Sequence, residues 1–252
     1  MRRSAVFGVL ALLVFGHATG AQEKKVVALN WLGHSYFMLT TAAGTRVAFD
    51  PHAISEYGSP MLAPDIAVIT HPHNDHNRTE VFSNADSKEL KVFQGVVVKG
   101  KKVDWAKIDE TFKNIKFRTV GLYHDKEEGK KRGKNSAFIV EADGLKFCHL
   151  GDLGHDLDDE QVKALGPVDV LMIPVGGIYT INGEEAKKVV SQLKPRLFVL
   201  PMHYATKVYT EVLPPDEFLD GQKYVRKLDG NRLDIPLDLK PDHPTVVLLE
   251  WK

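Results

Sequence analysis

The chain has 252 residues, of which 43% are hydrophobic, enough to bury one well-packed core. Its 33 basic residues balance its 33 acidic residues, so the sequence offers no basic face for nucleic acid, and nucleic acid is not predicted as a partner. A single cysteine, Cys148, excludes an internal disulfide, and its apolar neighbours in "LKFCHL" indicate a small core residue.

The first residues have the composition of a secretory signal peptide. A basic start, "MRR", precedes an apolar run over residues 5–15, and small residues follow at 18–21. Residues 1–21 are therefore predicted to be a cleaved signal, which leaves one domain, 22–252, in the periplasm or outside the cell. The apolar run is short for a transmembrane helix, so no stable membrane insertion is expected after cleavage. An uncleaved membrane anchor is the alternative.

Short β-like runs fill the first half of the mature chain. Their content of β-branched and aromatic residues predicts strands at 26–33, 35–41, 46–50 and 65–70. The "AAGT" segment between the second and third of these predicts a hairpin.

The second half alternates strands with helical pattern. A second hairpin is predicted from 136–142 and 145–150, joined through Asp143-Gly144. A helix is predicted at 183–193, with acidic residues in its first turn and apolar residues on one face, between strands at 168–175 and 196–201. This mixture predicts an α/β protein whose sheets are covered by helices on their outer sides.

Histidines are the most informative residues. There are eleven in the chain, and nine of them fall near the ends of predicted strands. Strand ends at one edge of a sheet are where α/β folds gather functional groups. These nine are His34, His52, His71, His73, His76, His124, His149, His155 and His203.

The stretch "ITHPHNDHN" packs three histidines and an aspartate into one loop, which indicates a shared metal. In an extended segment alternate side chains point the same way, so His71 and His73 can bind one ion together. Asp75 keeps that parity, whereas His76 turns to the other side as the chain bends. A second ion can therefore share Asp75 and His76, and two such cations need a bridging anion.

Residues further along the chain are candidates to complete this site. Asp152 lies directly after a predicted strand in "HLGDLGH" and is the candidate bridging carboxylate. His124 and His203 would complete the two sets of ligands. His149 and His155 compete with His124 for the same role.

Five motifs in order, "THPHNDHN", "YHD", "HLGDLGH", "IPVGGIYTI" and "PMHYAT", resemble the metallo-β-lactamase fold superfamily. Within it, the chain is similar to small single-domain hydrolases of the ascorbate-6-phosphate lactonase-like branch. The resemblance covers about residues 26–250. It implies a four-layer αββα sandwich with a dinuclear metal site along one edge.

The resemblance also implies a ligand set. His71, His73 and His124 would hold the first ion, Asp75, His76 and His203 would hold the second, and Asp152 would bridge them. All of these ligands offer nitrogen or oxygen, which favours zinc and also suits manganese or iron.

Two further residues receive roles from the resemblance. A histidine and an aspartate at the places of His34 and Asp50 lie close to the metals in that superfamily, and His34 is a candidate catalytic residue with Asp75. Asp50 would fix the tautomer of a ligand imidazole, or it simply forms an Asp-Pro turn. His52 is predicted to lie at the surface.

The charged, glycine-containing loop at 124–135 has two interpretations. It is either a solvated excursion or a mobile flap whose Lys131 or Arg132 meets an anionic substrate. Tyr179 and Tyr204 are candidates for hydrogen bonds in the pocket or for packing.

The sequence therefore predicts an exported, metal-dependent hydrolase acting on a small molecule. A hydroxide held between two cations would attack an ester, lactone or phosphodiester, with Asp75 steering it and later passing on a proton. No G-x-S-x-G motif indicates a serine nucleophile. The alternatives are a β-lactamase and a non-catalytic metal- or ligand-binding protein on the same scaffold. Oligomeric state is not predicted.

Overall fold

A computed structural model describes residues 25–58, 60–100 and 102–252 of the chain. The predicted signal peptide at 1–21 lies outside these residues, so its cleavage stays a prediction. No helix in the described ranges is long and apolar enough to cross a membrane.

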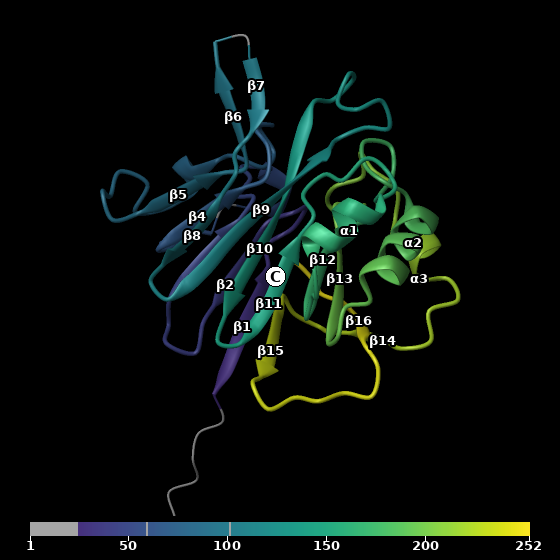
Figure 1. The fold of residues 1–252 in the computed structure, drawn as a ribbon. Coiled ribbons are helices and arrows are strands. Elements are labelled where there is room, and N and C mark those ends of the chain that lie inside the picture. The colour runs from purple at the N-terminus through teal and green to yellow at the C-terminus, as the bar shows by residue number, and fades with distance from the viewer. Residues whose placement is uncertain (1–24, 59, 101) are drawn as a thin grey trace, which may run out of the picture.

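Two mixed β-sheets form the centre of the molecule (Figure 1). The first sheet has six strands in the order β15-β1-β2-β3-β4-β5. Its strands are β1 (Val26–Trp31), β2 (Phe37–Thr40), β3 (Arg46–Phe49), β4 (Ile66–Ile69), β5 (Lys91–Gln94) and β15 (Arg232–Pro236). A separate two-stranded ribbon, β6 (Val96–Lys99) and β7 (Lys102–Trp105), projects beyond it.

The second sheet has eight strands in the order β14-β16-β13-β12-β11-β10-β9-β8. These are β8 (Asp109–Phe112), β9 (Ile115–Tyr123), β10 (Lys134–Ala142), β11 (Leu145–His149), β12 (Val170–Pro174), β13 (Phe198–Met202), β14 (Val225–Lys227) and β16 (Thr245–Leu248). Because both sheets contribute side chains to one buried apolar cluster, they pack face to face.

Alternation along the strands decides which side chains enter this cluster. On β2, Phe37 and Leu39 point into the space between the sheets, whereas Met38 points to the opposite face. Val47 and Phe49 of β3 share the inward direction. This period of two is what a pleated strand imposes, and it places the largest side chains in the shared core.

Three helices accompany the second half of the chain: α1 (Asp159–Leu165), α2 (Gly183–Leu193) and α3 (Asp216–Leu219). Figure 1 shows them together beside β12 and β13 of the eight-stranded sheet. A capping box begins α2, because the Asn182 side chain accepts from the Glu185 N–H and the Glu185 carboxylate accepts from the Asn182 N–H. The buried face of α2 contains Ala186, Val189 and Leu193, and the predicted bounds of this helix are confirmed.

The outer face of the six-stranded sheet is covered differently. A second apolar cluster there joins Tyr36 and Met38 to Phe82, which follows the short 3₁₀ turn η2 (Thr79–Val81). A further 3₁₀ turn, η1 (Ser55–Tyr57), precedes β4. The α/β sandwich is confirmed, and in the described residues its layer over this sheet consists of irregular chain and 3₁₀ turns.

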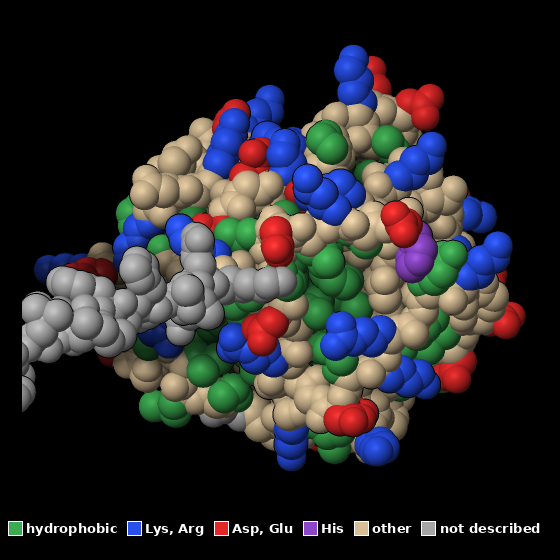
Figure 2. Space-filling view, turned by 90° about the horizontal axis from the view of Figure 1, so that it is seen from below, with side chains coloured by type: hydrophobic (Ala, Val, Ile, Leu, Met, Phe, Trp, Pro, Cys, Tyr) green, Lys and Arg blue, Asp and Glu red, His purple; other side chains and the backbone are tan. Residues whose placement is uncertain are grey.

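The two predicted hairpins are confirmed as β2–β3 and β10–β11, each antiparallel. Basic and acidic side chains are interspersed on the face seen in Figure 2, so this face offers no uniform basic surface.

Candidate metal centre

The candidate residues meet because their strands run in the same direction. In the first sheet β3 and β4 are parallel, and in the second β11, β12 and β13 are parallel. The histidine loop follows β4, Asp152 follows β11 and His203 follows β13. The carboxyl ends of these strands, in both sheets, therefore lie along one shared edge, and the candidate residues meet there.

The first group contains His71, His73 and His124. One ring nitrogen from each lies within 4.8 Å of the others. The ring centroids are 4.6 Å apart for His71 and His73, and 5.0 Å apart for His73 and His124. Three imidazoles that converge this closely form a set of donors for one divalent ion.

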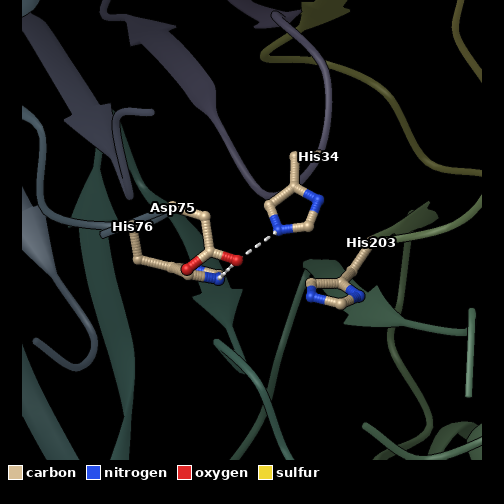
Figure 3. A group of neighbouring side chains, drawn as sticks. All are labelled: His34, Asp75, His76 and His203. Atoms are coloured by element: carbon tan, nitrogen blue, oxygen red, sulfur yellow. Dashed lines mark hydrogen bonds and ion pairs between the residues drawn. The ribbon is translucent and has the colours of Figure 1, made fainter. Parts of the chain in front are cut away.

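The second group contains His34, Asp75, His76 and His203, again with one donor atom from each within 4.8 Å of the rest (Figure 3). His34 Nε2 lies 3.1 Å from Asp75 Oδ2, and His76 Nε2 lies 3.7 Å from the same oxygen. Three of these residues are the ones expected for a second ion, and His34 joins them as a fourth donor.

Asp152 lies between the two groups. Its Oδ2 is 3.2 Å from His124 Nε2 in the first group and 3.1 Å from His203 Nε2 in the second. Its Oδ1 is 3.3 Å from His76 Nε2. The side chain is 2% exposed, so this carboxylate has no access to bulk water and depends on its neighbours for compensation.

Asp50 orients the rings of His76 and His71, the first directly and the second through Thr70. Its Oδ2 accepts the Thr70 hydroxyl at 2.6 Å and lies 2.9 Å from His76 Nδ1. Thr70 Oγ1 in turn lies 2.9 Å from His71 Nδ1. This network requires a proton on Nδ1 of both rings, so the Nε2 of each ring is the atom that faces the two groups. Of the two interpretations of Asp50, the structure favours tautomer control.

Several buried polar atoms in the described residues lack a hydrogen-bond partner. His71 Nε2, His76 Nε2 and Asp152 Oδ1 are among them. His76 Nε2 and Asp152 Oδ1 lie close together but without hydrogen-bond geometry. A buried polar atom without a partner costs about 1–3 kcal/mol. Cations placed among these atoms would satisfy all three, so the donor set fits a metal pair.

Burial controls the protonation of most of these groups. Burial, reinforced by the neighbouring His203, lowers the pKa of His34 to about 3. Burial also lowers the pKa of His71 and His73. These imidazoles are therefore neutral near pH 7, which is the form that binds metal.

Neighbouring charges control the protonation of the remaining groups, Asp152, His76 and Asp75. Burial alone would raise the pKa of Asp152, but His203 and His76 hold it well below its usual range. Burial alone would lower the pKa of His76, yet Asp152 and Asp50 hold that pKa well above its usual range. Burial also opposes ionisation of Asp75, whose pKa stays below its usual range through the hydrogen bond with His34 and the charge of His76.

Strained backbone accompanies the site. His34, Asp50 and His203 have φ angles of 51°, 44° and 53°, a left-handed conformation that side chains with a Cβ seldom adopt. Each such residue costs on the order of 1–3 kcal/mol and persists only where its surroundings enforce it. Here the His34 carbonyl accepts hydrogen bonds from the His203 N–H and from Trp31 Nε1, both at 3.0 Å. The loops that follow β1 and β13 are thereby tied together.

Two glycines permit close approach of the ligand loops. A Cβ on Gly154 would lie 2.3 Å from the backbone of His124, and one on Gly176 would lie 2.0 Å from the carbonyl oxygen of His203. The glycines in "HLGDLGH" and "IPVGGIYTI" are therefore required by packing against the ligand residues.

The histidines that compete with His124 lie elsewhere. His149 Nε2 is 2.9 Å from the Ser35 carbonyl oxygen, and its ring stacks on Phe49 in the core. His155 Nε2 accepts the Tyr123 N–H. The structure thus places His124, and neither of the other two, beside His71 and His73.

The expectation that His52 lies at the surface is wrong. Its side chain is buried, and its Nε2 lies 3.2 Å from the carbonyl oxygens of Leu32 and Gly33. Its Nδ1 accepts the Ile54 N–H. His52 therefore fixes the turn that carries His34, a role that the Asp-Pro-His segment alone does not reveal.

A cavity of about 250 Å³ opens over the two groups. Beyond the candidate ligands it is lined by Arg132, Tyr179, Tyr209 and Glu211. Tyr209 and Glu211 received no role from the sequence, because they follow the ligand His203 in a segment without a motif. Tyr204, in contrast, stacks on Trp31 with ring centroids 5.2 Å apart and serves packing.

Comparison with known proteins shows the family of this chain. Residues 28–203 match the Beta-lactamase superfamily domain. The chain is 30% identical over 238 residues to a metal-dependent hydrolase of Pyrococcus abyssi, covering 86% of this chain and 97% of that one. A metal-dependent hydrolase of Thermococcus onnurineus is 29% identical over 237 residues, with the same coverage.

A solved structure is also similar to this chain. A Thermotoga maritima protein, described as a Zn-dependent hydrolase of the metallo-beta-lactamase superfamily, is 32% identical to this chain. It superimposes with a TM-score of 0.66, covering 89% of this chain and 98% of its own.

The two donor groups predict a defined metal content. Protein saturated with zinc and freed of excess by gel filtration should carry two ions per chain, measured by inductively coupled plasma mass spectrometry. His73→Ala should reduce this to one ion, because the first group loses one of its three imidazoles. His155→Ala, a strand-end histidine outside both groups, should keep two. Equal losses in the two variants would contradict the assignment.

Proposed function

The chain belongs to the metallo-β-lactamase superfamily as a metal-dependent hydrolase, and we propose that it is an exported enzyme using two divalent cations to cleave an ester, lactone or phosphodiester. One observation carries the dinuclear part of this proposal. A single buried carboxylate, Asp152, stands within 3.3 Å of ring nitrogens from both donor groups. A bridging position is the one in which such a carboxylate serves two cations at once.

The assignment of donors follows from this placement. His71, His73 and His124 would hold one ion, and Asp75, His76 and His203 would hold the other, with His34 close enough to join them. Imidazole and carboxylate suit zinc, and they also accept manganese or iron. Bound cations of this kind lower the pKa of water to about 7 and polarise a carbonyl or phosphoryl oxygen.

The residues of the chain supply orientation and proton transfer. Asp75 lines the cavity and is partly exposed, so it reaches both the donor group and an entering substrate. Its hydrogen bond with His34 fixes the direction of the carboxylate. Because its pKa is held below the usual range, the carboxylate is ionised and can accept a proton from a water molecule and later release it to the leaving group.

Catalysis is favoured over simple metal storage by the shape of the site. A cavity of about 250 Å³ adjoins Asp75, Asp152 and His203, which is room for part of a small-molecule substrate. A site that only binds metal needs no such opening beside its ligands.

Export is proposed from the sequence of the first 21 residues, with their basic start, apolar run and small residues. A location in the periplasm or outside the cell follows from it. That location argues against a phosphorylated cytosolic sugar as the substrate.

Hydrolysis and the role of Asp75 are tested together. Zinc-loaded protein should turn over at least one of three probes: bis(4-nitrophenyl) phosphate, 4-nitrophenyl acetate or δ-valerolactone. Asp75→Asn should lower kcat by about 100-fold or more with little change in KM, because positioned proton transfer contributes 10²–10⁴-fold. Metal content measured on the same sample separates loss of an ion from loss of proton transfer. Absence of turnover on all three probes with two ions bound would contradict a hydrolase of these classes.

Export is tested in the native host. Mass spectrometry of the purified protein should give a mature N-terminus near residue 22. An intact Met1 would overturn the assignment of a cleaved signal peptide.

A further inference from the structure

The cavity over the donor groups has one basic side chain on its wall. Among the described residues lining it, Arg132 is the only lysine or arginine. It comes from the charged loop at 124–135. A ligand that fills the cavity as far as Asp75 therefore shares it with a guanidinium group.

The loop holds Arg132 in place through a buried carboxylate. Asp125 is 5% exposed, and its two oxygens accept four backbone N–H groups of the same loop. One of these donors is the Arg132 N–H, at 2.7 Å. Removing a buried carboxylate from four donors is costly, so the loop is closed on itself and presents Arg132 in a fixed direction.

The charge of Arg132 is available to a ligand. Its Nη2 donates to the Ile178 carbonyl oxygen at 3.2 Å, and its guanidinium carbon lies 5.5 Å from the centre of the Tyr179 ring. Within the described ranges no carboxylate forms an ion pair with it. A guanidinium with five N–H donors and one such bond retains the fork that binds carboxylate or phosphate.

Two nearby lysines are paired with carboxylates. Lys131 pairs with Glu127, and Lys126 pairs with Glu185. Of the two residues that the sequence offered for an anionic substrate, Arg132 lines the cavity over the donors and Lys131 does not.

A second cavity, of about 430 Å³, adjoins the first and shares Arg132 and Tyr179 with it. Three exposed apolar side chains are among the residues that line it: Ile178 is 54% exposed, Tyr179 41% and Leu213 48%. Exposed apolar area that gathers at the mouth of a site is typical of a binding surface. Ile178 also has a φ of 54°, a strained conformation for a β-branched residue, which is common at functional sites.

The first cavity is also lined by carboxylates. Asp75 and Asp152 belong to the donor groups, and Glu211 accepts a hydrogen bond from the Tyr209 hydroxyl at 3.3 Å. Each of these carboxylates repels an anionic group of the ligand, so among the lysine and arginine side chains that line the cavity in the described residues, Arg132 alone offers such a group a partner.

We propose that the substrate carries an anionic group, a carboxylate or a phosphate, that Arg132 binds beside the bond to be cleaved, and an apolar group that covers Ile178, Tyr179 and Leu213. This inference rests on the proposed function, because it places the reacting bond at the two donor groups. Arg132 is then a specificity-determining residue, and the enzyme prefers amphiphilic anionic esters, lactones or phosphodiesters over neutral ones.

Binding of small acids to the zinc-loaded protein tests this without turnover. Butyrate offers one carboxylate for the cations, succinate adds a second at the same chain length, and hexylsuccinate adds an apolar arm. We expect succinate to bind about tenfold more tightly than butyrate, and hexylsuccinate about tenfold more tightly again, by isothermal titration calorimetry. Comparing 3-phosphonopropionate with succinate distinguishes a phosphate from a carboxylate as the preferred anion.

Two variants separate the contributions. Arg132→Gln should abolish the advantage of succinate over butyrate. Leu213→Ser should remove only the advantage of hexylsuccinate over succinate. Lys130→Gln removes a positive charge from an exposed position of the same loop that lines neither cavity, so it should change neither ratio.

Equal affinities of wild type for butyrate and succinate, or an unchanged ratio in Arg132→Gln, would overturn the inference. Failure of the proposed function is recognised separately, because metal content and turnover of the three hydrolysis probes are measured on the same preparation. A protein with two ions and turnover but no preference for succinate retains the function and loses the anion subsite.

Discussion

One buried carboxylate dominates the centre of this protein. Asp152 is 2% exposed and stands among three imidazoles from two different sheets. An ionised carboxylate without water is stable only beside positive charge, so either protonated histidines or cations must surround it. His76, whose pKa is raised, supplies part of that charge. Burial lowers the pKa of His34, His71 and His73 and keeps these rings neutral, so they supply none of it. The proposed pair of cations resolves the imbalance, and the reaction class follows from it.

The fold is arranged around this requirement. Parallel strands in both sheets end at one edge, and the hydrogen bond from the His203 N–H to the His34 carbonyl ties the two ends together. Left-handed backbone at His34, Asp50 and His203 is the cost of that convergence, and the packed sheets beneath offset it. Glycines at 154 and 176 let the neighbouring loops approach the ligand backbones within distances that no side chain would permit.

Much of this could be predicted from the sequence. The spacing of His71, His73, Asp75 and His76 predicts a shared metal site, because alternate side chains of an extended chain point the same way and can converge. The helix at 183–193 was recognisable because acidic residues in its first turn and the period of its apolar residues agree. The choice of His124 over His149 was not readable from spacing, since both lie at strand ends and only the packing shows His149 on the Phe49 ring. Nor could the sequence distinguish Arg132 from Lys131, because that depends on how Asp125 closes the loop.

The most direct test is a crystal structure of the zinc-loaded protein with anomalous diffraction measured at the zinc edge. We expect two peaks: one among His71, His73 and His124, the other among His34, Asp75, His76 and His203, with Asp152 between them. A single peak, or peaks away from Asp152, would contradict the claim that this carboxylate bridges a metal pair.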